Sequence, residues 1–94
     1  MSKKEAYEKK IESQIEEWNA EISKLKAKAD QKEADAQVAY HEEIEDLRAK
    51  QDALREKLLE LRASSESAWE DVKTGVQKSF DDMQSAIRSA MDRF

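Results

Sequence analysis

The feature that most constrains this chain is the near absence of residues that break helices. Its 94 residues include no Pro and a single Gly, Gly75. Because these two residue types most strongly destabilise helix interiors, almost every segment is free to be helical. Charged residues make up 41 % of the chain and hydrophobic residues 38 %, a balance typical of coiled coils when the apolar residues are periodic. The sequence therefore predicts an all-α protein.

Apolar residues recur at helical spacing along most of the chain. From Ile15 to Ala29 the steps alternate between three and four residues, which is the spacing of a heptad seam. Between Ala27 and Ala39, Val38 is the one large aliphatic residue among small Ala residues, and no Gly, Pro, Asn or Ser interrupts the stretch. Since Ala is the best helix former, we expect one uninterrupted helix over about residues 3–62.

The one break that the sequence predicts is the Ser-rich segment 63–67. Ser competes for backbone hydrogen bonds and favours helix ends over helix interiors. Ser67 followed by Glu70 is a capping-box pattern, which predicts a second helix over about residues 68–94. The two helices would form a helical hairpin in a single helical domain, 1–94. A single helix that continues through the Ser residues and forms a rod is the alternative.

The unequal lengths of the two predicted helices indicate self-association. At about 1.5 Å per residue the first helix would be roughly 90 Å long and the second roughly 40 Å. The shorter helix would leave the stripe from Tyr7 to Leu25 uncovered, which is unfavourable in water. We therefore predict an antiparallel coiled-coil or helical-bundle homo-oligomer, a dimer or a tetramer. In the dimer, the N-terminal half of each long helix docks between the helices of its partner, with a twofold axis near residues 31–36.

The predicted self-association surface consists of the apolar side chains that form the stripes of both helices. These residues are Tyr7, Ile11, Ile15, Trp18, Ile22, Leu25, Ala29, Ala36, Tyr40, Ile44, Leu47, Leu54, Leu58, Leu61, Trp69, Val72, Val76, Phe80, Met83, Ile87, Met91 and Phe94. Gln51 also falls on the stripe. It either fixes the register of the helices or lies at a partly exposed edge of the seam.

No constellation of residues points to catalysis or to a cofactor. His41, the single His, begins the string H-E-x-x-E, which lacks the second His of the zinc-binding H-E-x-x-H helix. Val38 stands where the Glu-x-x-His motif of carboxylate-bridged metal bundles needs Glu. The Ser residues cluster at the predicted turn, and one Gly cannot build a phosphate-binding loop. We predict a protein that is not an enzyme and that has no catalytic, cofactor or metal residues.

Charge and hydropathy limit the partners and the compartment. The net charge is −5, with 17 basic and 22 acidic residues well mixed, which disfavours nucleic-acid binding. The chain has no Cys, no apolar signal-peptide core and no stretch of about 20 apolar residues, so we expect the cytoplasm. The amphipathic segment from Trp69 to Phe94 supports an alternative function as a peripheral membrane or lipid-interacting protein. An unidentified protein that completes the seam is a further alternative partner.

Three segments carry a resemblance to a known family. The run from Ser67 to Met83, which contains Trp69-Glu70-Asp71 and Asp81-Asp82, resembles the C-terminal part of small bacterial coiled-coil proteins labelled stress-response. Residues 58–64 and 5–18 are similar as well. No biochemical activity is established for that family. The resemblance therefore implies a bacterial cytosolic setting and an association with stress, and we predict a structural or scaffold role exerted through self-assembly.

Overall fold

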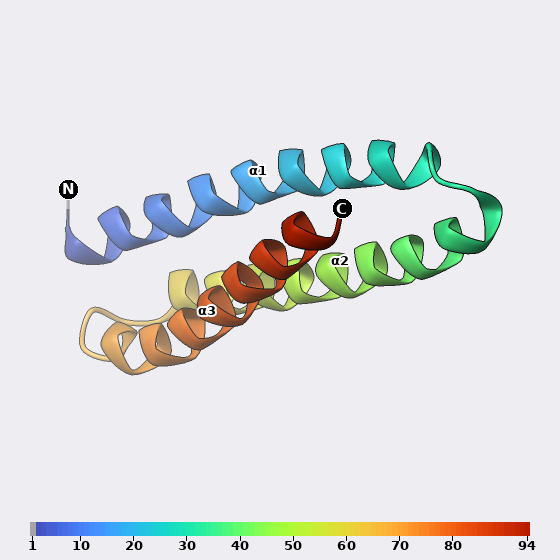
Figure 1. Ribbon diagram of the computed structural model, residues 1–94. Coiled ribbons are helices and arrows are strands. Elements are labelled where there is room, and N and C mark those ends of the chain that lie inside the picture. Colours follow the sequence, from blue (N-terminus) through green and yellow to red (C-terminus); the bar gives the residue numbers. More distant parts are fainter. Residues whose placement is uncertain (1) are drawn as a thin grey trace.

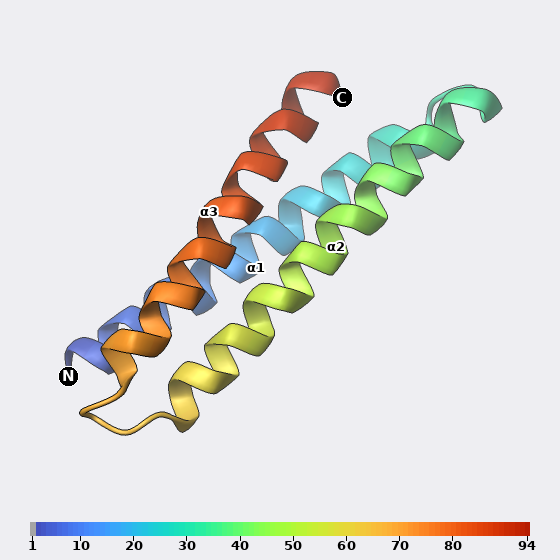
Figure 2. The same ribbon diagram turned by 90° about the horizontal axis from the view of Figure 1, so that it is seen from below.

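The computed structural model describes residues 2–94 and consists of three α-helices (Figure 1). They are α1 (Lys3–Asp30), α2 (Ala34–Ala63) and α3 (Trp69–Arg93). α1 and α2 run antiparallel, and α3 turns back along both in a bundle of 52 × 19 × 18 Å (Figure 2). The described residues contain no strand, so the predicted all-α class is confirmed.

The uninterrupted helix predicted over residues 3–62 is wrong. The chain reverses at Gln31, Lys32 and Glu33, which we call the tip turn. The physical reason is tertiary packing, because folding α1 back onto α2 lets the chain bury its own apolar stripe. Burying one large aliphatic side chain contributes about 1.5–3 kcal/mol, whereas one backbone hydrogen bond lost at the turn costs about 1 kcal/mol. Several buried side chains therefore outweigh the local preference for helix.

The second turn lies in the Ser-rich segment, where the sequence predicts it, and we call it the Ser turn (residues 64–68). The Ser64 amide and hydroxyl both donate to the Leu61 carbonyl, at 3.1 and 2.5 Å, and so end α2. The predicted capping box is wrong, because Ala68 precedes the first residue of α3 and no side chain caps this end. The Ser67 hydroxyl lies 3.2 Å from the Ser65 hydroxyl instead.

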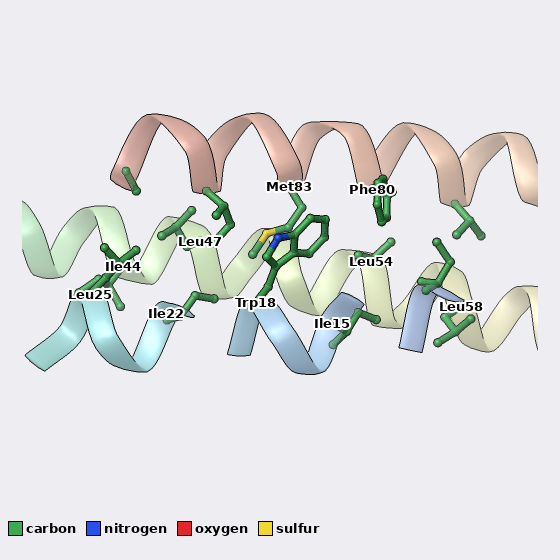
Figure 3. Packing of buried hydrophobic residues seen from close by; sticks show 14 of the residues in the cluster. Ile15, Trp18, Ile22, Leu25, Ile44, Leu47, Leu54, Leu58, Phe80 and Met83 are labelled. Atoms are coloured by element: carbon green, nitrogen blue, oxygen red, sulfur yellow. The ribbon is translucent and has the colours of Figure 1, made fainter. Parts of the chain in front are cut away.

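The core runs along the whole contact between the three helices (Figure 3). Trp18 of α1 projects between α2 and α3, and its ring centroid lies 5.0 Å from that of Phe80. Ile11 and Ile22 of α1 are fully buried against the other two helices. The premise that the N-terminal stripe needs a second copy to be covered is therefore wrong, because α2 and α3 of the same chain cover it.

Candidate self-association surface

Most of the predicted seam residues are buried inside the single chain. Those buried on α1 and α2 are Tyr7, Ile11, Ile15, Trp18, Ile22, Leu25, Ala29, Ile44, Leu47, Leu54, Leu58 and Leu61, and those on α3 are Trp69, Val76, Phe80, Met83 and Ile87. Ala36, Tyr40, Val72 and Phe94 are partly buried. The structure thus brings the predicted residues together in one seam, which forms within the chain.

Met91 is the predicted seam residue that the structure exposes. Its side chain is 51 % exposed, while its neighbour Ala90 is fully buried. After Phe80, the buried positions of α3 continue at steps of three and four to Ala90, which keeps a heptad spacing. Within the single chain, Ala90 and not Met91 therefore lies on the buried face of α3, and the predicted role of Met91 in self-association stays a prediction.

Gln51 is the one buried polar residue among the described residues. Its side-chain amide donates to the Ile15 carbonyl of α1 at 3.2 Å. Of the two sequence interpretations, this contact supports a role in setting register, because the hydrogen bond forms only when position 51 of α2 lies opposite position 15 of α1. A polar residue in an apolar seam commonly specifies alignment in this way.

The end of the bundle that holds the Ser turn is tied together by contacts between distant residues. Lys4 of α1 donates its ammonium to the carbonyls of Arg62 and Ser64, at 3.2 and 2.6 Å. The Arg62 guanidinium also pairs with the Glu12 carboxylate at 2.7 Å. The start of α1 is therefore fastened to the end of α2.

Tyr7 joins α1 to α3 at the same end. Its hydroxyl donates to the Gln77 side-chain carbonyl at 3.0 Å, and the Lys73 ammonium lies 4.9 Å from its ring centroid. Burial raises the pKa of the Tyr7 phenol, and the nearby Asp81 carboxylate raises it further. Packing and one charged neighbour account for this shift.

The tip turn is held by shorter-range contacts between exposed groups. The Gln37 side-chain amide donates to the carbonyls of Asp30 and Lys32, at 3.0 and 2.8 Å. His41, the residue considered for metal binding, lies 3.0 Å from the Asp30 carboxylate through its Nε2. Within residues 2–94, no group of three or more His, Asp or Glu side chains is arranged to hold a metal ion.

Comparisons with protein-family models, with curated proteins and with solved structures found no match for this chain. The resemblance to stress-labelled coiled-coil proteins therefore stays a prediction. None of the helices described above is both long and apolar enough to cross a bilayer.

Proposed function

We propose that this protein is a structural or scaffold protein without enzymatic activity, which acts by associating with further copies of itself. The observation that carries the proposal is the register contact between Gln51 and Ile15 within a continuous apolar seam. A seam of this kind specifies which helix face meets which, and at what alignment. The same specification serves contacts within a chain and contacts between chains.

The side chains on the surface of α3 and at Tyr7 support the proposal that the protein is structural. A depression along α3 is lined by side chains of both charges together with Thr74 and Gln77. Tyr7, whose phenol pKa is raised by burial and by Asp81, is engaged in packing between α1 and α3. The association with stress and the cytoplasmic location rest on the sequence alone and form part of this proposal.

Lipid binding by α3 is the competing function. In the structure the apolar face of α3, including Trp69, Phe80 and Met83, is buried against the other helices. Binding a membrane through that face would first require α3 to leave the bundle and to give up its packing with Trp18. We therefore favour self-association.

Molar mass measured by light scattering, together with circular dichroism over a dilution series, tests the proposal. We expect the mass to rise with concentration from that of one chain, 10.9 kDa, toward that of two, while helicity stays constant. A mass of one chain at every concentration would contradict self-association. Co-sedimentation with anionic vesicles would favour the lipid-binding alternative instead.

A further inference from the structure

We propose that the tip turn is a hinge and that two copies associate by exchanging α1. In the exchanged dimer the tip turn becomes helical, α1 and α2 fuse into one long helix, and α1 packs against α2 and α3 of the second copy. This inference rests on the proposed self-association and specifies its geometry. Four features of the structure support it.

The first feature is the conformation of the tip turn. Gln31 already has helical dihedral angles, with φ −88° and ψ −6°. Glu33 has a helical φ of −62°, and only its ψ of 154° departs from a helix. No described residue has a positive φ, and the three turn residues are all good helix formers. Few backbone dihedral angles must therefore change to convert this turn into helix. No Gly or Pro at residues 31–33 opposes the change.

The second feature is the weak capping on the α2 side of the hinge. Glu33 precedes α2 without a side-chain hydrogen bond to the first turn, whereas the Ser2 hydroxyl accepts one from Glu5 at the start of α1. The first amides of a helix and its last carbonyls lack partners within that helix. Straightening the hinge joins the end of α1 to the start of α2 and gives these groups intrahelical partners.

The third feature is the phase of the apolar stripe across the hinge. Ile22 and Ile44 are separated by 22 positions, and so are Leu25 and Leu47. This spacing equals two eleven-residue repeats, which return to nearly the same face of a straight α-helix. All four residues are buried in the present seam. A straightened helix would therefore present them as one continuous stripe.

The fourth feature is the register of the two helices. Position 33 lies midway between Ile15 and Gln51, which are hydrogen-bonded, and midway between Lys4 and Arg62, which are also hydrogen-bonded. It is also the midpoint of a helix that runs from Lys3 to Ala63. Two such helices, antiparallel about a twofold axis at position 33, would re-form both hydrogen bonds between chains. Exchange therefore keeps the contacts that α1 makes with α2 and α3, but α1 then comes from the other copy of the chain.

The contacts that oppose exchange are few and local. The hydrogen bonds from Gln37 to the carbonyls of Asp30 and Lys32 depend on the turn itself, and so does the contact between the His41 imidazole and the Asp30 carboxylate. All three are exposed, and polar contacts that compete with water contribute little net stability. The closed chain and the exchanged dimer therefore share nearly all of their packing, so protein concentration decides between them.

Ala34→Pro tests the hinge directly. Ala34 is the first residue of α2, a position that accepts Pro, and the extended ψ of Glu33 is the conformation preferred before Pro. Within a continuous helix the same Pro is strongly destabilising, by about 100-fold per chain in the equilibrium constant. We expect the dimerisation constant to fall by about 10⁴-fold while the single chain keeps its helicity. Ala34→Ser, which retains the backbone amide, is the matched control.

A variant with the opposite effect makes the test independent of Pro. Replacing Gln31, Lys32 and Glu33 together by Ala raises helix propensity only at the hinge. We expect the dimerisation constant to increase by about tenfold. If this triple variant associates no more tightly than the natural chain, the hinge proposal is wrong, even if Ala34→Pro fails to fold.

Cross-linking distinguishes exchange from other modes of association. The chain has no Cys, so single cysteines can be introduced as Glu12→Cys in one preparation and Arg62→Cys in another. These positions meet at 2.7 Å as an ion pair, and both side chains are exposed. After the two preparations are mixed and refolded together, a short bis-maleimide should join the two introduced thiols between chains. The same mixture carrying Ala34→Pro should give no such product.

Two further outcomes would overturn the exchange. If the Ala34→Pro chain dimerises as tightly as the Ala34→Ser control, the copies associate through another surface, and self-association itself stands. If the natural chain, the control and the triple Ala variant all have the mass of one chain at every concentration, then exchange and the proposed function both fail.

Discussion

The two turns of this chain reverse its direction at opposite ends of one bundle, yet they are built differently. The Ser turn has a side-chain cap at Ser64 and is fastened by Lys4, which lies 60 positions away. The tip turn consists of helix-forming residues, and its hydrogen bonds from Gln37 reach only five and seven positions back. The Ser turn therefore combines a local cap with a long-range tie, whereas the tip turn has local hydrogen bonds but no residue that itself favours a turn.

This difference extends to the helices that flank each turn. Near the Ser turn three helices meet, and Tyr7 packs against Trp69 with ring centroids 6.4 Å apart. Near the tip, α3 ends where Phe94 packs on Tyr40, with centroids 4.4 Å apart, and only α1 and α2 continue. The tip turn, whose residues do not themselves favour a turn, thus lies where the bundle has two helices and not three. This coincidence is what a hinge between a closed chain and an exchanged dimer requires.

The largest expected difference between the Ser-turn end and the tip is the loss of unfolding free energy when an apolar side chain is shortened. Ile11→Ala, in the three-helix part, should reduce the free energy of unfolding by about 2–5 kcal/mol, because Ile11 is fully buried and a cavity would remain. Val38→Ala, near the tip, should change it by less than about 0.5 kcal/mol, because Val38 is 63 % exposed. Urea unfolding followed by circular dichroism measures both. Equal losses would contradict the burial of Ile11 and the exposure of Val38.

Tyr7 makes the Ser-turn end sensitive to alkaline pH. The pKa of its phenol is raised above the ordinary value of 10.0, so the folded state favours the protonated form. The stability that this group contributes is complete below the unfolded pKa and is lost as pH rises through the folded pKa. Tyr7→Phe should cost about 0.5–1.5 kcal/mol at neutral pH, because the hydrogen bond to Gln77 is lost. Its stability should then fall less steeply above a pH of 10.0, the ordinary phenol pKa, than that of the natural chain. Parallel slopes would show that the phenol is not the group responsible.

The same contrast explains how much of the fold could be predicted from the sequence. The seam was predictable because Ile11, Leu54 and similar residues repeat at helical spacing, and burial follows that spacing. The Ser turn was predictable because its residues prefer helix ends. The tip turn was not, since Gln31, Lys32 and Glu33 favour helix and only the packing of α1 on α2 overrides them.

The finer details of the seam were harder to predict from the sequence than its position. Gln51 could be placed on the seam, but its partner Ile15 depends on where the chain reverses. Ala90 and Met91 lie three and four positions after Ile87, both at helical spacing, and only the structure shows that Ala90 is the buried one. Periodicity therefore identified the buried face, and the three-dimensional contacts decided the alignment along it.

The smallest expected effects come from the side chains that hold each turn. Lys4→Met keeps the aliphatic stem but removes the ammonium from the Ser64 and Arg62 carbonyls, and it should cost about 1 kcal/mol. Gln37→Ala removes two exposed hydrogen bonds at the tip and should cost about 0.5 kcal/mol or less. The two variants should also differ in hydrogen exchange of the backbone amides. Lys4→Met should accelerate exchange at the start of α1, where a long-range tie is lost, whereas Gln37→Ala should accelerate it only around the tip turn. If Gln37→Ala also exposed the amides near Ile15, the tip would be coupled to the register of the whole seam, and the independence of the two turns would not hold.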